Sequence, residues 1–259
     1  MVNPENFLYK HVIVDEAQDF EQDWLETLDL VVGEGILAVF YDPLQSIQKH
    51  SQELSTWIKN LEIRLSLNRN CRNTESIAKT SYAFLNQRPP RMLHTVTGER
   101  PNWIEAPSDG KVYWHIILDL VQKNLRDNIS PEEIALMTFL PIERSPLNAM
   151  KYIQFGNRKI DFSEKREKGK ILKTTIRKFK GLEAQVVIIL DLIFPKDKQK
   201  EEDLNQKLKL LYTASSRARS YLYLISLPVP PEVHWQSDNP IPAKEFRDWF
   251  RTEYGLTYS

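Results

Sequence analysis

The stretch that decides the fold is Val12-Ile13-Val14-Asp15-Glu16-Ala17-Gln18-Asp19, an apolar run that ends in two adjacent acids. Three consecutive β-branched residues are typical of a buried strand. Ligands of open α/β sheets bind beyond the carboxyl ends of the strands, so carboxylates at such an end can serve magnesium-dependent phosphate chemistry. The plainer alternative is that the two acids cap the helix that follows.

The next residues continue the pattern of an α/β fold. Residues 20–32 carry apolar side chains near helical spacing, and residues 36–42 form a second apolar run that again ends in an acid. A strand, a helix and a strand of these lengths predict that 11–15 and 36–42 lie side by side in parallel.

The rest of the chain repeats this alternation. Residues 112–124 fit either a strand followed by a helix or one helix. A proline-rich tail from Pro228 to Pro242 precedes an amphipathic helix near the C-terminus. Further helices are expected at 51–60, 74–86 and 203–218, and strands at 102–105, 134–138, 171–176, 186–191 and 221–226.

The pentapeptide 15–19 resembles the Walker B element, motif II, of UvrD/Rep-like superfamily 1 helicases. Four later stretches resemble further motifs of that family in the family's order: motif III at 39–47, motif IV at 67–77, motif V at 175–183 and motif VI at 211–218. The resemblance implies RecA-like parallel sheets of the P-loop NTPase type with flanking helices. It places a partial first lobe at 1–62 and a complete second lobe, with the C-terminal tail and helix, at 63–259.

The resemblance also implies ATP and Mg²⁺ as cofactors and assigns roles to the strand-end residues. Asp15 would hold Mg²⁺ through water, and Glu16 would be the base for hydrolysis. Gln18 and Gln45 would sense the γ-phosphate. Their chemistry fits, because carboxylates and amides supply the oxygen ligands and hydrogen bonds that hydrated Mg²⁺ and phosphate require.

In the second lobe, Arg72 and Arg217 are the implied catalytic arginines, which would stabilise charge on the transferred phosphoryl group. Glu183 would bind the ribose, and Gly181 would let the backbone approach the nucleotide. For each arginine taken alone, the alternative is a surface salt bridge. We expect replacement of Arg217 to leave the melting temperature unchanged, because an arginine that waits for nucleotide has little structural role. The residues implied to contact nucleic-acid phosphates are Thr175, Arg177 and Lys178.

A glycine-rich phosphate loop that ends in Gly-Lys-Thr or Gly-Lys-Ser does not occur in this sequence, which holds eight glycines. The chain therefore resembles the C-terminal part of a helicase, and its implied partner is the missing N-terminal helicase segment. We expect the chain alone to hydrolyse no appreciable ATP, since the backbone N–H groups and lysine of that loop cradle the phosphates.

Composition narrows the class of protein further. The formal charge is zero, but residues 150–181 hold eleven basic and three acidic side chains. Such a stretch is either a solvated face or a nucleic-acid contact. The single cysteine, Cys71, fits the reducing cytoplasm. No apolar run approaches the roughly 20 residues that span a bilayer, and the histidines have no metal-ligand spacing.

The sequence predicts an ATP-dependent superfamily 1 helicase or translocase that moves 3′ to 5′ on single-stranded or partly duplex DNA, with RNA as an open alternative. The other class of function is a non-catalytic nucleic-acid-binding or regulatory module derived from a helicase second lobe. A phosphate loop encoded upstream in the same reading frame would favour the motor over the module.

Overall fold

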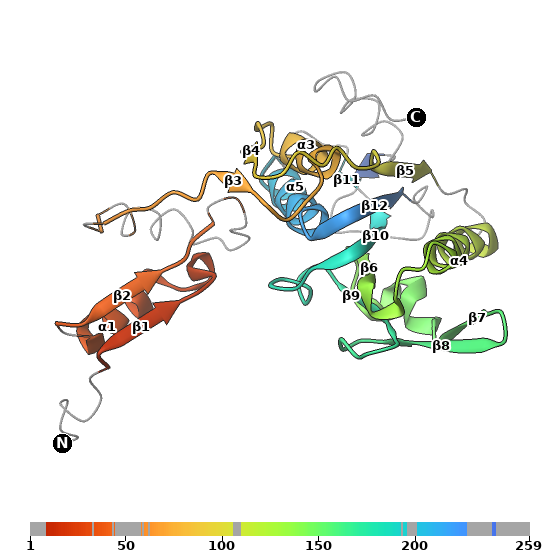
Figure 1. The fold of residues 1–259 in the computed structure, drawn as a ribbon, viewed down its shortest axis with the longest axis horizontal. Helices are drawn as coiled ribbons and strands as arrows, with labels where there is room; N and C mark the ends of the chain where they lie inside the picture. The colour runs from red at the N-terminus through yellow and green to blue at the C-terminus, as the bar shows by residue number, and fades with distance from the viewer. Residues whose placement is uncertain are drawn as a thin grey trace. The chain divides into compact units, whose positions relative to one another are not determined.

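The structure is a computed structural model that describes residues 9–32, 34–42, 44, 58, 60–61, 63–105, 110–192, 194–195, 201–226 and 240–241. The chain divides into two compact units, Met1–Leu67 and Asn68–Ser259. Figure 1 labels the helices and strands of both units. Within the described residues, no helix is long and apolar enough to cross a membrane.

The first unit contains the strand, helix and strand that its sequence predicts: β1 (His11–Val14), η2 (Ala17–Asp19), α1 (Gln22–Val32) and β2 (Ile36–Val39). β1 and β2 pair in parallel, which confirms the predicted pairing. The helix begins two residues later than the sequence predicts, because the 3-10 turn η2 first carries the chain away from the strand end. β2 ends at Val39, earlier than expected.

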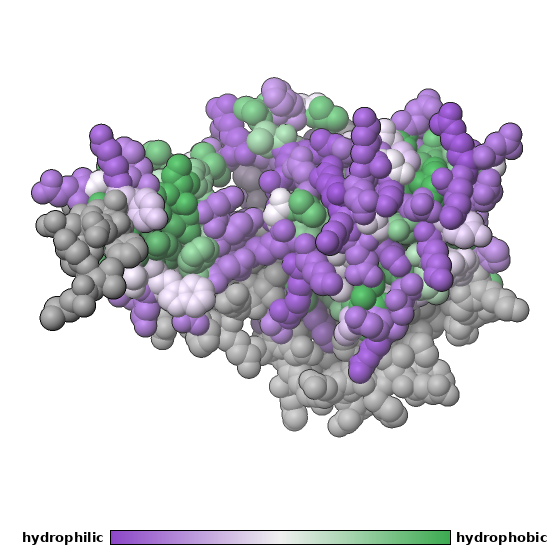
Figure 2. All heavy atoms as spheres, turned by 90° about the horizontal axis from the view of Figure 1, so that it is seen from below, coloured by the Kyte–Doolittle hydropathy of each residue, from purple (hydrophilic) through white to green (hydrophobic). Residues whose placement is uncertain are grey.

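Within the described residues, the core of the first unit lies on one side of its two-stranded sheet. Val14, Ala17 and Leu25 are buried together, with α1 packed against one face of the two strands. On the opposite face, Ile13 is 72% exposed and Ile36 is 62% exposed. Figure 2 shows the hydrophobic side chains of this unit gathered in green at the left of the view.

The second unit is built around a seven-stranded sheet in the order β5-β12-β10-β6-β9-β8-β7. The strands pair in parallel, except that β7 and β8 form an antiparallel hairpin at one end. The strands of this sheet are β5 (Asn102–Glu105), β6 (Ile134–Thr138), β7 (Tyr152–Phe155), β8 (Arg158–Ser163), β9 (Ile171–Thr175), β10 (Ala184–Leu192) and β12 (Ala218–Ser226).

Helices cover both faces of this sheet, and the sequence of β10 shows why. Alternate residues of β10 belong to two different hydrophobic clusters: Val187 and Ile189 to one, Val186 and Ile188 to the other. The first cluster includes α3 (Glu75–Ala83) and α5 (Glu201–Ser215), and the second includes α4 (Gly110–Arg126). Parallel strands buried on both faces read as continuous apolar runs, as this strand does. The α/β fold with flanking helices is therefore confirmed.

Several predicted elements change in detail. Residues 110–126 form one helix, which settles the alternative left open for 112–124. The hairpin of β7 and β8 was not predicted; it turns at Gly156-Asn157, where Gly156 has a positive φ of 56°. The helix expected to run to 218 ends at Ser215, and β12 begins at Ala218.

Short elements complete the second unit. β3 and β4 pair with each other, and β11 pairs with β13. The expected C-terminal helix and nearly all of the helix predicted at 51–60 lie outside the described residues. The short elements are β3 (Arg69–Asn70), β4 (Arg91–Met92), η4 (Pro131–Glu133), η5 (Ile142–Arg144), η6 (Pro146–Ala149), β11 (Phe194–Pro195) and β13 (Pro240–Ile241).

Candidate functional site

In the first unit, the acids predicted at the strand end stand directly after β1. Glu16 adopts a left-handed backbone with φ 53°, and its Oε2 accepts a hydrogen bond from Gln18 Nε2 at 2.5 Å. Gln18 is only 2% exposed, and its Oε1 accepts the Asp42 N–H at 3.1 Å. One buried amide thus ties the acid after β1 to the acid that follows β2.

The strand-end acids do not cap a helix by the usual side-chain hydrogen bond. Glu16 occupies the position before η2 and makes no side-chain cap there. Asp15 is exposed, and its Oδ1 accepts the Glu16 N–H at 2.8 Å. An exposed carboxylate of this kind fits a hydrated Mg²⁺, which is commonly held by one or two carboxylates and by water. Gln45 lies outside the described residues.

In the second unit, Arg72 of motif IV and Glu183 of motif V meet in a charged cluster with Glu133, Arg166 and Arg219, the residue directly after motif VI. Arg72 Nε lies 2.9 Å from Glu183 Oε2. Arg219 lies between the two glutamates, 2.6 Å from Glu133 Oε2 and 3.8 Å from Glu183 Oε1. Arg166 donates to the Glu183 carbonyl at 2.9 Å and to Glu133 Oε1 at 3.3 Å.

Hydrogen bonds to backbone carbonyls connect motif VI to the same region. Asn73 Nδ2 donates to the carbonyl of Ser216 at 2.9 Å and to that of Ala218. The Ala184 N–H donates to the Arg217 carbonyl at 3.1 Å. Residues predicted as motifs IV, V and VI, far apart in the sequence, therefore form one continuous hydrogen-bonded region.

Arg217 stands in the turn between α5 and β12 and is only 3% exposed. A guanidinium this deeply buried contributes to the packing around it. This burial argues against the expectation that its replacement leaves the melting temperature unchanged, because a truncated side chain would leave a cavity and disturb the packing around it. Arg72, by contrast, forms the partly exposed ion pair that was the alternative for each arginine.

The residues implied to contact nucleic acid lie at the carboxyl end of β9 and in the turn that follows it. Thr175 ends the strand, and its carbonyl accepts the N–H groups of Lys178 and Phe179 at 3.1 Å. Phe179 is buried, whereas Arg177 and Lys178 are exposed. The buried aromatic anchors the turn, so two cations are presented to solvent from a fixed backbone.

Gly181 ends this turn with φ 83°, in the left-handed region that favours glycine. A Cβ at this position would meet no atom within 4 Å. The backbone conformation therefore explains the glycine in this structure, without any close approach of another group.

Sequence reasoning missed several polar residues of the second unit. Arg219 and Glu133 complete the charged cluster. The sequence signal for Arg219 was a second arginine two positions after Arg217, at the start of a strand. Asp191 is completely buried, and the clue was a lone acid in the apolar run of β10. Burial raises the pKa of Asp191 above its usual value, and its hydrogen bonds oppose that rise.

Lys173 is a second buried charge, inside the basic stretch 150–181. Its Nζ donates to the carbonyls of Leu147 and Met150 at 2.9 and 2.8 Å and to that of Asn148 at 3.3 Å. Burial lowers the pKa of this amine. The basic stretch is thus mixed, because Lys173 is structural, Arg166 joins the charged cluster, and Arg177 and Lys178 are exposed.

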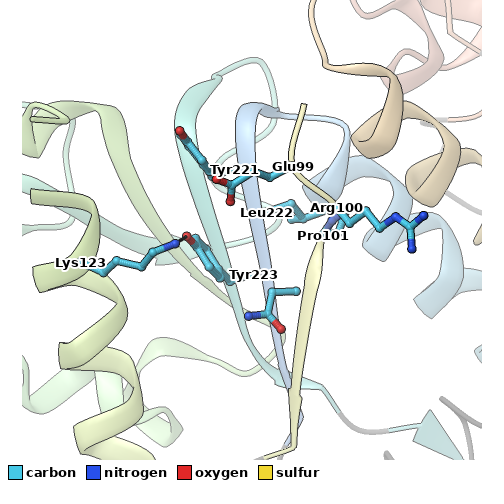
Figure 3. Close-up of a pocket in the computed structure, with 8 residues that line it drawn as sticks. Glu99, Arg100, Pro101, Lys123, Tyr221, Leu222 and Tyr223 are labelled. Atoms are coloured by element: carbon cyan, nitrogen blue, oxygen red, sulfur yellow. Dashed lines mark hydrogen bonds between the residues drawn. The ribbon is translucent and has the colours of Figure 1, made fainter. Parts of the chain in front are cut away.

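A pocket of about 360 Å³ opens beside β5, β12 and α4. Figure 3 shows Lys123 reaching from α4 toward Tyr223 while Arg100 points away from both. Lys123 Nζ donates to the Tyr223 hydroxyl at 3.3 Å, and this hydrogen bond raises the pKa of Lys123. None of the residues predicted to act on nucleotide or nucleic acid lines this pocket.

Comparison with known proteins finds similarity in the second unit. Residues 170–225 match the family of the UvrD-like helicase C-terminal domain, which confirms the predicted resemblance. The chain is similar to the crystal structure of the C-terminal domain of a possible DNA helicase from Lactobacillus plantarum WCFS1, at 21% sequence identity and a TM-score of 0.41. That similarity covers 61% of this chain and 88% of the other. Among curated proteins there is no match.

Proposed function

We propose that this chain is the C-terminal part of an ATP-dependent superfamily 1 DNA helicase or translocase that moves 3′ to 5′ on single-stranded DNA. The observation that carries the proposal is the meeting of motifs IV, V and VI. Arg72 contacts Glu183 directly, and Ala184 bonds to the carbonyl of Arg217, although these residues lie more than thirty positions apart. The family match covers motif V and motif VI.

The charged cluster supports a role in nucleotide binding. Arg72 and Glu183 form an ion pair, and both side chains are about 40% exposed. Such partly exposed pairs contribute little to stability, so they can separate at small cost. When ATP binds, Arg72 would turn to the phosphates and Glu183 to the ribose hydroxyls. Arg219 would keep Glu183 neutralised after Arg72 leaves.

In the first unit, Glu16 would take the proton of the attacking water. The Gln18 amide donates to Glu16 and also accepts from the backbone after β2, so it orients the carboxylate against the second strand end. Asp15 would hold a hydrated Mg²⁺, which neutralises charge on the phosphates when it is bound. A base fixed by a buried amide needs no reorganisation at the moment of proton transfer.

On the nucleic-acid side, Arg177 and Lys178 would bind backbone phosphates. Clustered cations supply much of the sequence-independent affinity for DNA, and that affinity falls as salt rises. The turn that carries them follows a strand of the rigid central sheet. Movement of this turn together with the sheet would couple a conformational change at the nucleotide to a step along the DNA strand.

The test is DNA-stimulated release of phosphate from ATP. The chain would be expressed together with the genomic coding sequence directly upstream of it, and phosphate release would be measured with and without single-stranded DNA. The motor proposal expects turnover that rises with DNA and a tailed duplex that is unwound only from a 3′ tail. Unwinding only from a 5′ tail would contradict the proposed direction.

The alternative, a non-catalytic nucleic-acid-binding module, is favoured by a different observation. The Arg72–Glu183 ion pair, at 2.9 Å, engages the two side chains that the motor proposal assigns to nucleotide. This alternative expects tight single-strand binding that ATP does not change. Binding without any turnover in the upstream-extended protein would therefore replace the motor proposal with the module.

A further inference from the structure

Asp191 has an unusual backbone for a residue inside a strand. It lies near the end of β10 with φ 60°, and the pairing of β10 with β12 shifts register between Ile189 and Leu192. A left-handed non-glycine residue is strained and persists only where its surroundings fix it, although aspartate tolerates this conformation better than most residues. Bulges of this kind redirect a side chain, and here the carboxylate points into the interior.

Three hydroxyl groups converge on this carboxylate. The Tyr113 hydroxyl donates to Oδ1 at 2.8 Å, and Thr138 Oγ1 and Ser145 Oγ donate to Oδ2 at 2.5 and 2.7 Å. The Asp191 N–H in turn donates to the Tyr113 oxygen at 3.2 Å. The carboxylate therefore joins four segments: α4, the end of β6, the loop 139–150 and β10.

The network extends to the turn that carries the proposed nucleic-acid contacts. The Thr138 carbonyl accepts the N–H of Ile176, the first residue after β9, at 3.2 Å. In the sheet, Thr138 pairs with Thr175 on one side and with Leu190 on the other. Asp191, Thr138 and Thr175 thus stand at one edge of the sheet, where three parallel strands end.

The loop 139–150 at this edge is held from two directions. Ser145 fixes it to Asp191, and Lys173 fixes its last turn through the three carbonyls of Leu147, Asn148 and Met150. Apolar residues of similar volume often stabilise a fold as well as a buried charged network does. A buried network is better suited to specifying one geometry than to adding stability.

We propose that Asp191 is a positioning residue for nucleic-acid binding at this edge. It ties the end of β6 and the loop 139–150 to β10, and through the Thr138 carbonyl it fixes the start of the turn that presents Arg177 and Lys178. This inference rests on the proposed function, because it assumes that these two cations bind nucleic acid. Asp191 itself touches no nucleic acid and acts through Thr138.

The experiment compares Asp191→Asn with Asp161→Asn in the full chain. Both substitutions remove one negative charge, but Asp161 is exposed on β8. Asparagine keeps the size of aspartate and tolerates the left-handed backbone, while its amide replaces one acceptor oxygen. Binding would be measured by fluorescence anisotropy with labelled oligothymidylate, and backbone order by hydrogen exchange without DNA.

The proposal expects Asp191→Asn to weaken binding by about tenfold, equivalent to about 1.4 kcal/mol. Asp161→Asn should bind as well as the wild type or slightly better, since the loss of a negative charge by itself favours binding of anionic DNA in both variants. Exchange in Asp191→Asn should rise in 139–150 and 176–182 and stay unchanged in β5 and β12. Unchanged affinity with faster local exchange would overturn the positioning role, as would a rise in exchange over the whole second unit.

Thr138→Val keeps the inference testable if Asp191→Asn does not fold. Valine has nearly the shape of threonine and removes the hydroxyl, which donates to Asp191 and accepts the Leu140 N–H at 2.9 Å. Weaker binding with local loosening would support the proposal, and wild-type affinity would overturn it. Failure of the wild-type chain itself to bind oligothymidylate would instead contradict the proposed function, a result distinct from any effect confined to the variants.

Discussion

The two units of this chain differ in how their chemistry is supported. In the first unit, Asp15 and Glu16 extend from a two-stranded sheet whose described core consists of Val14, Ala17 and Leu25 with partly buried neighbours. In the second, the charged cluster and the turn after β9 extend from a seven-stranded sheet buried on both faces. The buried apolar side chains among the described residues of the first unit are far fewer than those of the second, so we expect the proposed hydrolytic acids to have the less stable support.

The comparison also shows two ways to fix a functional side chain. Glu16 accepts a hydrogen bond from the amide of Gln18, two residues away. Glu183 is held by Arg72 and Arg219, which come from distant parts of the sequence. Local contacts can form before a domain is complete, whereas the charged cluster exists only once the second unit has folded.

The largest expected effect concerns Glu16. In the upstream-extended protein, Glu16→Gln should lower ATP turnover by roughly hundredfold or more, because it removes the proposed general base. Glu21→Gln, five residues later, removes the same charge from an exposed site and serves as the control. Steady-state phosphate release with single-stranded DNA gives the measurement. Equal activities of the two variants would show that the first unit does not supply the base.

Arg217 should show a smaller catalytic effect together with a structural one. Lysine lacks the planar fork that fits phosphoryl oxygens, so Arg217→Lys should lower turnover by at least roughly tenfold. Because the side chain is buried, Arg217→Ala should also lower the melting temperature of the chain by at least about 3 °C. Arg126→Lys on the exposed end of α4 is the control. Normal turnover by Arg217→Lys would show that motif VI is misassigned.

Hydrogen exchange should separate the two units directly. We expect amides of β1 and β2 to exchange at least about tenfold faster than those of β6 and β10, a difference in protection of about 1.4 kcal/mol. Mass spectrometry of peptides from the full chain provides the rates. Equal protection in both units would mean that the first unit is stabilised by more than the cluster of Val14, Ala17 and Leu25.

The smallest effect concerns pH and the buried carboxylate of Asp191. Burial raises the pKa of this group in the folded chain. Between the ordinary aspartate pKa of about 4 and the raised value, the folded chain holds a proton that the unfolded chain lacks, so the free energy of unfolding falls as pH rises. Asp191→Asn has no such proton. Across this pH range, the melting temperature of the wild type relative to that of Asp191→Asn should rise as pH falls. A difference that does not change with pH would contradict the raised pKa.

The sequence predicted the strands and the acids that follow them for a physical reason. Apolar runs that end in acids, such as 12–16, and the continuous run 186–190 carry their structure locally, and parallel pairing follows from strand spacing. The parallel pairing of β1 with β2 and the flanked α/β sheet of the second unit were predictable on these grounds. The RecA-like topology of both lobes stays a prediction.

The rest depended on long-range contacts that no local pattern encodes. The place of Glu133 beside Arg219, 86 residues away, follows only from the order of strands in the sheet. The burial of Arg217 depends on the packing of α5 against β12, and the left-handed backbone of Asp191 depends on a register shift with the neighbouring strand. The β7–β8 hairpin lacked a long alternating pattern, because one of its two strands has only four residues.

The measurement that tests the account most directly is the salt dependence of oligothymidylate binding by the full chain. Arg177→Ala/Lys178→Ala removes two cations from the turn after β9, and Lys79→Ala/Arg126→Ala removes two exposed cations from α3 and α4 as a matched control. Each phosphate contact contributes about 0.7 to the slope of log K against log salt for single strands. The account predicts that the first pair weakens binding and lowers this slope by about 1.4 while the control pair leaves both nearly unchanged. Equal effects of the two pairs, or no binding by the wild type, would contradict it.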